Sequence, residues 1–179
     1  MIHPLAKFLF CPCCGSAHFK VNDFKSKRCT DCGFTFYHNA AAATVAVILN
    51  SRNELLVTRR AFNPAAGTLD LPGGFVDAGE TAEEGIVREV EEETGGKAVV
   101  EKFLFSLPNE YVYSDFIVHT TDLFFLCQLL DETALIAHDD AAALFWIPLA
   151  DIRPSNFGLA SIAAGGQRLL ESNISYTPT

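Results

Sequence analysis

Two groups of side chains in this sequence have the types and the spacing to bind metal ions. The group nearer the N-terminus is two Cys-x2-Cys pairs, Cys11/Cys14 and Cys29/Cys32, each followed by a glycine. Two residues between the ligands let one tight turn place both thiolates on the same side of the chain, and the glycine supplies the positive φ that turns backbone amides toward the sulfurs. The two pairs are separated by residues 15–28, a spacer only slightly shorter than the roughly 15 to 20 residues of zinc ribbons. The spacing therefore predicts a structural Zn²⁺ site on these four cysteines.

The same N-terminal segment has other interpretations. The cysteines could be reduced structural residues or form a disulfide, Cys13 should point elsewhere, and Cys127 lies in an apolar run that indicates a buried strand. Lysines and phenylalanines alternate between Lys7 and Arg28, as in a stacking platform for single-stranded nucleic acid. We favour a structural role, because a module of about 30 residues buries few of its own aromatic side chains and uses the metal as its core. We expect these phenylalanines to dock on the rest of the protein.

The second group of candidate ligands lies on a predicted helix with both ends marked. Thr81 and Glu84 have the spacing of a capping box at its start. The periodic segment covers residues 82–94, and Gly95 and Gly96 provide a left-handed stop. On a helical wheel, the apolar residues of this segment form a narrow stripe that should face a core.

Three carboxylates, Glu89, Glu92 and Glu93, share one side of this helix. Their spacings bring like charges within about 5–6 Å, which destabilises an isolated helix by a few tenths of a kcal/mol for each pair. A Mg²⁺ or Mn²⁺ ion would compensate, because hard divalent cations prefer carboxylate oxygens and take further ligands from phosphate. The arrangement therefore indicates phosphate chemistry. For the other glutamates of the helix we expect solvated side chains: Glu83, Glu84 and Glu91.

The elements that must position this helix follow from hydrophobic patterning. Residues 44–49 and 54–60 predict two strands that form a hairpin around a turn at 50–53. After the helix, a strand over 98–106 should lead into a loop over 107–114. Further scaffold elements are expected at these positions: strands over 121–129 and 145–148, and a final helix over 157–171.

Composition limits the classes of protein to which the chain can belong. Its 179 residues fit one main domain with a small appendage, and 49% hydrophobic against 20% charged residues indicate a globular protein. A net charge of -9 argues against sequence-blind binding of nucleic acids. The longest apolar run, residues 40–49, is far shorter than the ~18 residues that cross a bilayer. Lys7 and the cysteines after it do not fit a secretory signal, so we expect a cytoplasmic protein without membrane contact.

The residues around the predicted helix carry a resemblance to a known family. This segment is similar to the Nudix box, which takes the form Gly74-x5-Glu80-x7-Arg88-Glu89-Val90-x-Glu92-Glu93-x-Gly95. One departure is Gly96, where the family has an aliphatic residue, and we expect looser packing after the helix. The resemblance implies an α+β fold: a Nudix α/β/α sandwich with a mixed sheet over residues 39–179, preceded by a small zinc ribbon over residues 1–38. A ribbon ahead of a Nudix domain is similar to the architecture of NADH pyrophosphatases.

The resemblance implies Mg²⁺- or Mn²⁺-dependent hydrolysis of a nucleoside diphosphate linked to another moiety, as in NADH, NAD or ADP-ribose, with release of a nucleoside monophosphate. Arg88 and Glu80 would form an ion pair that orients the metal-binding glutamates. Nudix enzymes take the base that accepts a proton from the attacking water either from the box or from a later loop, and Glu92 or Glu89 is our first choice. Four acids outside the box are also available, but we expect them to be solvated loop or turn residues: Glu110, Asp115, Asp139 and Asp140. The resemblance implies these metal ligands: Glu89, Glu92, Glu93 and a backbone carbonyl of Gly73 or Gly74.

Residues after the box would select the substrate. NADH pyrophosphatases carry Ser-Gln-Pro-Trp-Pro-Phe-Pro-x-Ser at this place, whereas this chain matches only the Ser-x-Pro at 106–108 and the final Ser114. The resemblance therefore does not extend to dinucleotide specificity. Tyr111 and Tyr113 could stack a base or pack against the sheet, and Asn109 could bind a base or ribose edge.

A function of a different class also fits a Nudix-like fold. A binding module would sense a nucleotide, while its ribbon contacts nucleic acid or a partner protein. Such a module tolerates loss of the metal-binding glutamates and needs a basic face, whereas this chain keeps the glutamates and is acidic. We therefore expect an enzyme that acts on a small nucleotide substrate, as a monomer or a homodimer.

Overall fold

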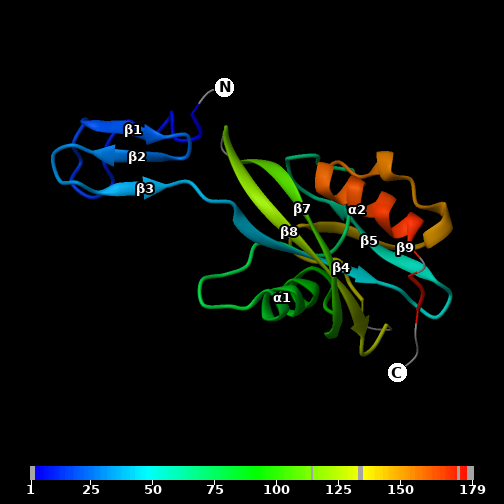
Figure 1. Ribbon diagram of the computed structural model, residues 1–179. Helices are drawn as coiled ribbons and strands as arrows, with labels where there is room; N and C mark the ends of the chain where they lie inside the picture. The colour runs from blue at the N-terminus through cyan, green and yellow to red at the C-terminus, as the bar shows by residue number, and fades with distance from the viewer. Residues whose placement is uncertain (1–2, 114, 133–134, 173, 177–179) are drawn as a thin grey trace. The chain divides into compact units, whose positions relative to one another are not determined.

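The computed structural model shows two compact units, Met1–Ala40 and Ala41–Thr179, and each is described by itself (Figure 1). Within the described ranges, no helix is long and apolar enough to cross a membrane. The structure describes these residues: 3–113, 115–132, 135–172 and 174–176.

The first unit is a small antiparallel sheet with the strand order β1-β2-β3. Its strands are β1 (Phe19–Asp23), β2 (Ser26–Cys29) and β3 (Thr35–Tyr37). One buried cluster of this unit consists of Cys11, Phe19 and Cys29, with Phe34 packed against them. Phe24 is exposed. A cluster this small fits a module that depends on a bound metal for its stability.

The described part of the second unit contains two three-stranded sheets. In the first, with the order β4-β8-β7, β4 (Ala41–Ile48) runs parallel to β8 (Phe116–Leu129), and β7 (Ala98–Tyr113) runs antiparallel to β8. The first sheet is therefore mixed. The second sheet is antiparallel, and its strands in spatial order are β6 (Leu69–Asp70), β5 (Glu54–Arg60) and β9 (Ala141–Pro148).

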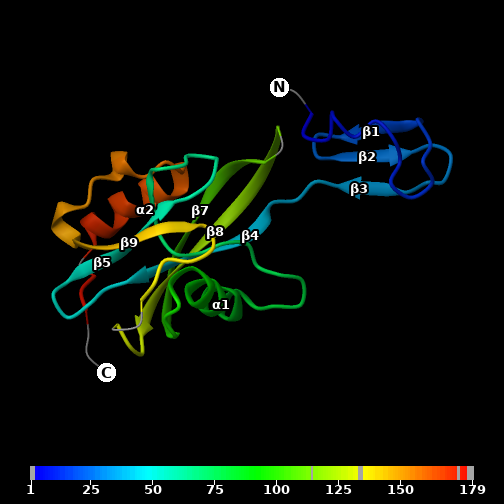
Figure 2. The ribbon, with the colours of Figure 1, turned by 180° about the vertical axis from the view of Figure 1, so that it is seen from behind.

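The helices α1 (Ala82–Thr94) and α2 (Ala160–Glu171) cover opposite faces of β4 (Figure 2). Successive side chains of a strand point to opposite faces. Val47 packs in the apolar cluster that contains Ile162 of α2, whereas Ile48 packs in the cluster that contains Ile86 of α1. The predicted α+β fold, an α/β/α sandwich with a mixed sheet, is confirmed.

The helix α1 begins and ends at the predicted residues. Thr81 Oγ1 accepts a hydrogen bond of 3.2 Å from the backbone N–H of Glu84, and the Glu84 carboxylate accepts one of 2.8 Å from the N–H of Thr81. Gly95 has a φ of 68°, and its N–H donates to the carbonyl of Glu91. Ile86 is fully buried, so the apolar stripe faces the core as predicted.

The hairpin predicted over residues 44–60 is wrong in its pairing. The chain does reverse at 50–53, where the Asn50 side chain accepts two backbone hydrogen bonds of 3.0 Å. An isolated bridge between Leu49 and Leu55 follows, and then the strands separate, because β4 pairs with β8 while β5 pairs with β6 and β9. Both strands have runs of consecutive buried residues, so each is covered on both faces.

Strand β7 continues through most of the segment predicted as a loop over 107–114. Its pairing with β8 extends from Leu107 opposite Asp122 to Tyr113 opposite Phe116. Pro108 does not interrupt the strand, because β7 is the edge of its sheet and can lack one N–H without losing a ladder bond. Ser114 lies outside the described residues.

The structure corrects two further expectations, one for the start of the last helix and one for the packing at Gly96. Helix α2 begins at Ala160 rather than at residue 157, because a 3-10 turn at Pro154–Asn156 and an extended segment precede it. Gly96 does not loosen the packing after α1. It is buried, and a Cβ there would lie 2.7 Å from Leu135 Cδ2 and 3.0 Å from Leu129 Cδ2. These two leucines occupy the volume that an aliphatic side chain would fill.

Candidate active site and metal centre

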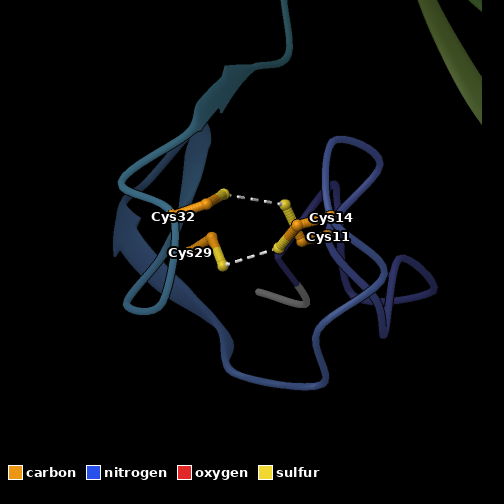
Figure 3. A group of neighbouring side chains, drawn as sticks. All are labelled: Cys11, Cys14, Cys29 and Cys32. Atoms are coloured by element: carbon orange, nitrogen blue, oxygen red, sulfur yellow. Dashed lines mark hydrogen bonds between the residues drawn. The ribbon is translucent and has the colours of Figure 1, made fainter.

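The four cysteines of the two Cys-x2-Cys pairs meet in the first unit (Figure 3). All four Sγ atoms lie within 4.8 Å of one another, with 3.7 Å between Cys11 and Cys32 and 3.7 Å between Cys14 and Cys29. Thiolates in a tetrahedron with Zn–S distances of about 2.3 Å would be about 3.8 Å apart. Cys13 is exposed and does not belong to the cluster. The donor set therefore fits one tetrahedral metal ion.

The two pairs form equivalent turns. The N–H of Gly15 donates to the carbonyl of Cys11 over 2.8 Å, and the N–H of Gly33 donates to the carbonyl of Cys29 over 3.0 Å. These glycines have φ values of 73° and 78°, which confirms the predicted positive φ. The backbone N–H of Cys32 stabilises the Cys29 thiolate and helps to lower its pKa to about 6. Thiolate is the form of cysteine that binds metals.

The second unit has a cavity of about 280 Å³ lined by acidic residues. The predicted residues Glu89, Glu92 and Glu93 of α1 line it, together with Gly73 and Gly74 from the segment before α1. The cavity therefore brings together the side chains that the spacing on the helix singled out. Acids from several other segments also line it: Asp70, Asp77, Asp122, Asp139 and Asp140.

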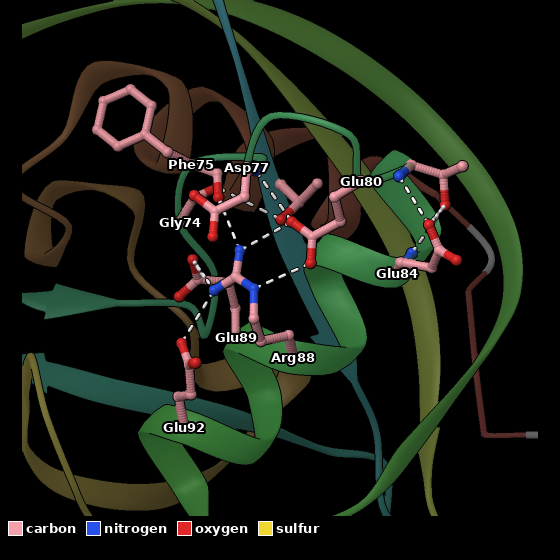
Figure 4. Close-up of polar contacts among 10 residues, drawn as sticks. Gly74, Phe75, Asp77, Glu80, Glu84, Arg88, Glu89 and Glu92 are labelled. Atoms are coloured by element: carbon pink, nitrogen blue, oxygen red, sulfur yellow. Dashed lines mark hydrogen bonds and ion pairs between the residues drawn. The ribbon is translucent and has the colours of Figure 1, made fainter.

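Arg88 donates hydrogen bonds to other residues of α1 and to the segment before it (Figure 4). Its Nε and Nη2 atoms donate to the two carboxylate oxygens of Glu80 over 2.9 and 3.0 Å. Its Nη1 atom donates to Glu89 and to Glu92, over 2.9 Å in each case. A further bond of 3.0 Å from Nη2 to the carbonyl of Phe75 ties the preceding loop to the helix. Hydrogen bonds from Arg88 lower the pKa of Glu80 and fix the positions of the other two carboxylates.

Glu93 is the buried member of the glutamate group, with 8% of its surface exposed. Among the described residues, its Oε2 atom has no hydrogen-bond partner. Burial raises the pKa of Glu93 to about 9, and the charges of Asp70 and Glu89 act in the same direction. The N–H of Gly73 opposes this shift. A bound cation would stabilise the charged form of a buried carboxylate that is enclosed by other acids.

The segment before α1 needs glycine at two successive positions. A Cβ on Gly73 would lie 2.0 Å from the carbonyl oxygen of Thr44, and a Cβ on Gly74 would lie 2.5 Å from Oε1 of Glu89. The carbonyl of Gly74 accepts a hydrogen bond of 2.8 Å from the N–H of Thr44. The backbone therefore passes directly between β4 and the glutamates of α1.

Of the three residues predicted to select the substrate, Asn109 and Tyr111 line the cavity and Tyr113 does not. Tyr113 lies near the end of β7 and is 66% exposed. Tyr111 Oη accepts a hydrogen bond of 3.1 Å from Nη2 of Arg60, which also lines the cavity. Stacking of Tyr111 on a base is therefore restricted by its contact with Arg60.

Sequence reasoning missed Arg60 and Asp70, and it set aside Asp139 and Asp140 as solvated acids, although all four line the cavity. Arg60 forms a buried ion pair with Asp70. Burial raises the pKa of Asp70, although the charge and hydrogen bond of Arg60 act in the opposite direction. Asp139 and Asp140 reach the cavity because the N–H of His138 donates to the carbonyl of Glu93 over 2.9 Å. No spacing in the sequence links these residues to the glutamates.

Comparison with known proteins identifies the family of the second unit. The sequence model of the NUDIX domain matches residues 39–165, which include every strand and helix that lines the cavity, apart from the end of α2. The chain belongs to the Nudix family. The Nudix box of the sequence is therefore the helix α1 and the glycine-containing segment before it.

Two curated relatives and one solved structure illustrate the similarity. The chain is 43% identical over 76 residues to an ADP-ribose pyrophosphatase of Methanocaldococcus jannaschii, covering 42% of this chain and 40% of that protein. It is 33% identical over 94 residues to the NAD-capped RNA hydrolase NudC of Haemophilus influenzae, covering 52% of this chain and 36% of the relative. The chain thus spans well under half the length of either protein.

The solved structure is a NUDIX hydrolase from Nitrosomonas europaea. It superposes with a TM-score of 0.75 at 20% identity, over 92% of this chain and 91% of that one. At this identity the likeness establishes the fold.

Proposed function

We propose that this Nudix protein hydrolyses the pyrophosphate bond of a nucleoside diphosphate linked to another moiety, of the type of ADP-ribose, NAD or NADH, and releases a nucleoside monophosphate. The main support is Glu93, a buried carboxylate with an unpaired oxygen among the described residues of an acidic cavity. Such a site favours a divalent cation, and a cation in a cavity favours phosphate oxygens as its remaining ligands. The two relatives, an ADP-ribose pyrophosphatase and an NAD-capped RNA hydrolase, have names that agree with this reaction class.

The donor set fits Mg²⁺ or Mn²⁺, because both ions prefer carboxylate and carbonyl oxygens. Glu89 and Glu93 would hold the ion, with Glu92 beside them. The carbonyl of Gly73 is a better candidate for a backbone ligand than that of Gly74, which already accepts a hydrogen bond from Thr44. When bound, the cation would neutralise charge on the pyrophosphate oxygens and make a water more acidic.

The chain's own side chains orient the reactants. Arg88 holds Glu89 and Glu92 through Nη1, and its pairing with Glu80 keeps the guanidinium in place. Glu92 or Glu89 takes the proton of the attacking water. The side chain of Glu92 is 48% exposed against 15% for Glu89, so Glu92 is the more accessible to an incoming water.

We also propose that the four clustered cysteines hold a structural Zn²⁺. Their sulfur spacing and the two glycine turns support this assignment. A set of four cysteine ligands fills every position of a tetrahedral ion, so the ribbon site would have no open position for a substrate. Its role is therefore to stabilise the first unit.

Glu93→Gln tests the assignment of the active site. The control is Glu91→Gln, since Glu91 is exposed on the same helix and does not line the cavity. With Mg²⁺ or Mn²⁺ and a panel of ADP-ribose, NAD, NADH, diadenosine polyphosphates and nucleoside triphosphates, we expect Glu93→Gln to lower release of the nucleotide product by about a thousandfold or more. Its circular dichroism spectrum should match that of the wild type. Undiminished turnover in Glu93→Gln would overturn the site.

The wild-type protein tests the reaction itself. Failure to hydrolyse any compound of the panel, while the protein binds these compounds, would favour the nucleotide-sensing module instead. The intact glutamates and the arginine that holds them favour the enzyme.

A further inference from the structure

The same cavity contains polar side chains of β7 and β8 that the proposed hydrolysis does not use. Asn109 lies opposite Thr120 across the antiparallel pair, and Asp122 follows Thr120 by two residues. Since side chains two residues apart share a face of a strand, all three point to the same side of the sheet. All three line the cavity.

Asp122 is a buried carboxylate held by hydroxyl groups. It is 3% exposed, its Oδ1 accepts a hydrogen bond of 2.5 Å from Thr120 Oγ1, and its Oδ2 accepts one of 2.5 Å from Ser161 Oγ. The ion pairs found among the described residues do not include Asp122. A carboxylate oxygen has about two lone pairs, so each oxygen retains the capacity to accept another hydrogen bond. Asp122 is thus fixed in orientation and still able to accept a donor.

Asn109 provides an independent indication of a ligand. It is 8% exposed, and its Oδ1 atom has no hydrogen-bond partner among the described residues. A buried polar atom without a partner costs stability, and native proteins keep few of them. A cavity-lining carbonyl in this state fits a donor that arrives with the substrate.

We propose that Asn109 and Asp122 select the base of the substrate by accepting the two hydrogens of an exocyclic amino group, that of adenine. The inference rests on the proposed function, because the pyrophosphate beside α1 brings the base into the same cavity. Leu159, which directly precedes α2, and Ile162 of α2 also line the cavity and offer apolar contact to the ring. Asp70, Asp122 and Glu93 all line this cavity, so the proposed base site and the glutamates of α1 belong to one space.

Both acceptors disfavour a base with an oxygen at the same position. Hypoxanthine differs from adenine mainly in that its 6-position carries an oxo group instead of an amino group. Its oxygen would face the Asp122 carboxylate and the Asn109 carbonyl without a hydrogen between them. A site built to hydrogen-bond one group rejects an analogue that lacks it far more strongly than an apolar pocket does.

The test compares ADP-ribose with IDP-ribose, its hypoxanthine analogue, at saturating Mg²⁺. We expect the wild type to have a kcat/KM at least about tenfold higher for ADP-ribose. Asp122→Asn should remove or invert this preference, because its amide can donate to the 6-oxo group. Asp151→Asn, an exposed acid outside the cavity, is the matched control and should keep the wild-type ratio. Asn109→Leu, which removes the second acceptor, should lower the ratio if Asp122→Asn fails to fold.

Calorimetric titration with AMP and IMP in the presence of Mg²⁺ separates this inference from the proposed function. Tighter binding of AMP that is lost in Asp122→Asn supports base selection even if no pyrophosphate is hydrolysed, in which case the proposed function fails alone. The inference is overturned if the wild type treats the two compounds of each pair alike, prefers the hypoxanthine compound or binds neither monophosphate. An unchanged preference in Asp122→Asn and Asn109→Leu would also overturn it.

Discussion

The two ligand clusters of this protein are assembled in different ways. In the ribbon, each pair of thiols belongs to one short turn, so a few consecutive residues set the geometry. In the cavity, the acids come from β6, the segment before α1, α1 itself, β8 and the segment after β8, and a folded core must exist before they meet. We therefore expect the first cluster to depend on a bound metal for its stability, whereas the second is positioned by a fold with apolar clusters of its own.

The largest effect should follow from loss of one ribbon cysteine. Cys29 is fully buried, and Cys29→Ser removes one of four donors whose metal contributes on the order of 10 kcal/mol to the folding of such modules. We expect bound zinc to fall from one per chain to none, and amide protection to be lost in residues 3–40. Residues 41–179 should keep their protection, because they have apolar clusters of their own.

Metal analysis and hydrogen exchange check this prediction, with Cys13→Ser as the control because Cys13 is exposed and outside the cluster. A Cys29→Ser protein that retains zinc and a protected ribbon would show that the ribbon does not depend on a complete set of four cysteine ligands.

The contrast also explains what the sequence could predict. The Cys-x2-Cys pairs and their glycines, the capping box at Thr81 and the stop at Gly95 are local patterns, and the structure contains each of them. Glu89, Glu92 and Glu93 were found for the same reason, because the 3.6-residue period of one helix places them together.

What the sequence could not predict depends on pairing between distant segments. The strands 44–49 and 54–60 resemble a hairpin locally, but their long-range partners are β8 and β9. Asp122 enters the cavity because β8 pairs with both β4 and β7, which places Asp122 opposite Ala43 and Leu107. Local patterning has no information about either choice of partner.

A smaller effect should appear in the pH dependence of the metal-free cavity. Glu93 has a pKa of about 9 in the folded protein against an ordinary value of 4.5, so between these pH values the folded state holds a proton that the unfolded state has released. The free energy of unfolding should therefore fall as pH rises from about 6 to about 8.5, with a slope of up to about 1.4 kcal/mol per pH unit. Added Mg²⁺ should offset this loss, because it binds the ionised carboxylate.

Urea unfolding of zinc-loaded, Mg²⁺-free protein measures this slope. The single tryptophan, Trp146 of β9, makes fluorescence a probe of the second unit alone. Glu93→Gln should flatten the profile and Glu91→Gln should leave it unchanged. A profile that rises with pH in the wild type would contradict the buried, uncompensated state of Glu93.

The smallest effect should come from the start of α1. Thr81→Ala removes the side chain that accepts a hydrogen bond from Glu84 N–H, and loss of such a cap costs about 1 kcal/mol. Thr81→Ser keeps the acceptor and should lose much less. Both variants should remain folded and keep their turnover, because Arg88 and the packing of Ile86 still hold the helix. The midpoint of urea unfolding, followed by Trp146 fluorescence, measures the difference. Complete unfolding of the second unit in Thr81→Ala would show that the carboxylate site depends on one local contact. The cavity would then resemble the ribbon, which we expect Cys29→Ser to unfold, and the contrast between the two ligand clusters would not hold.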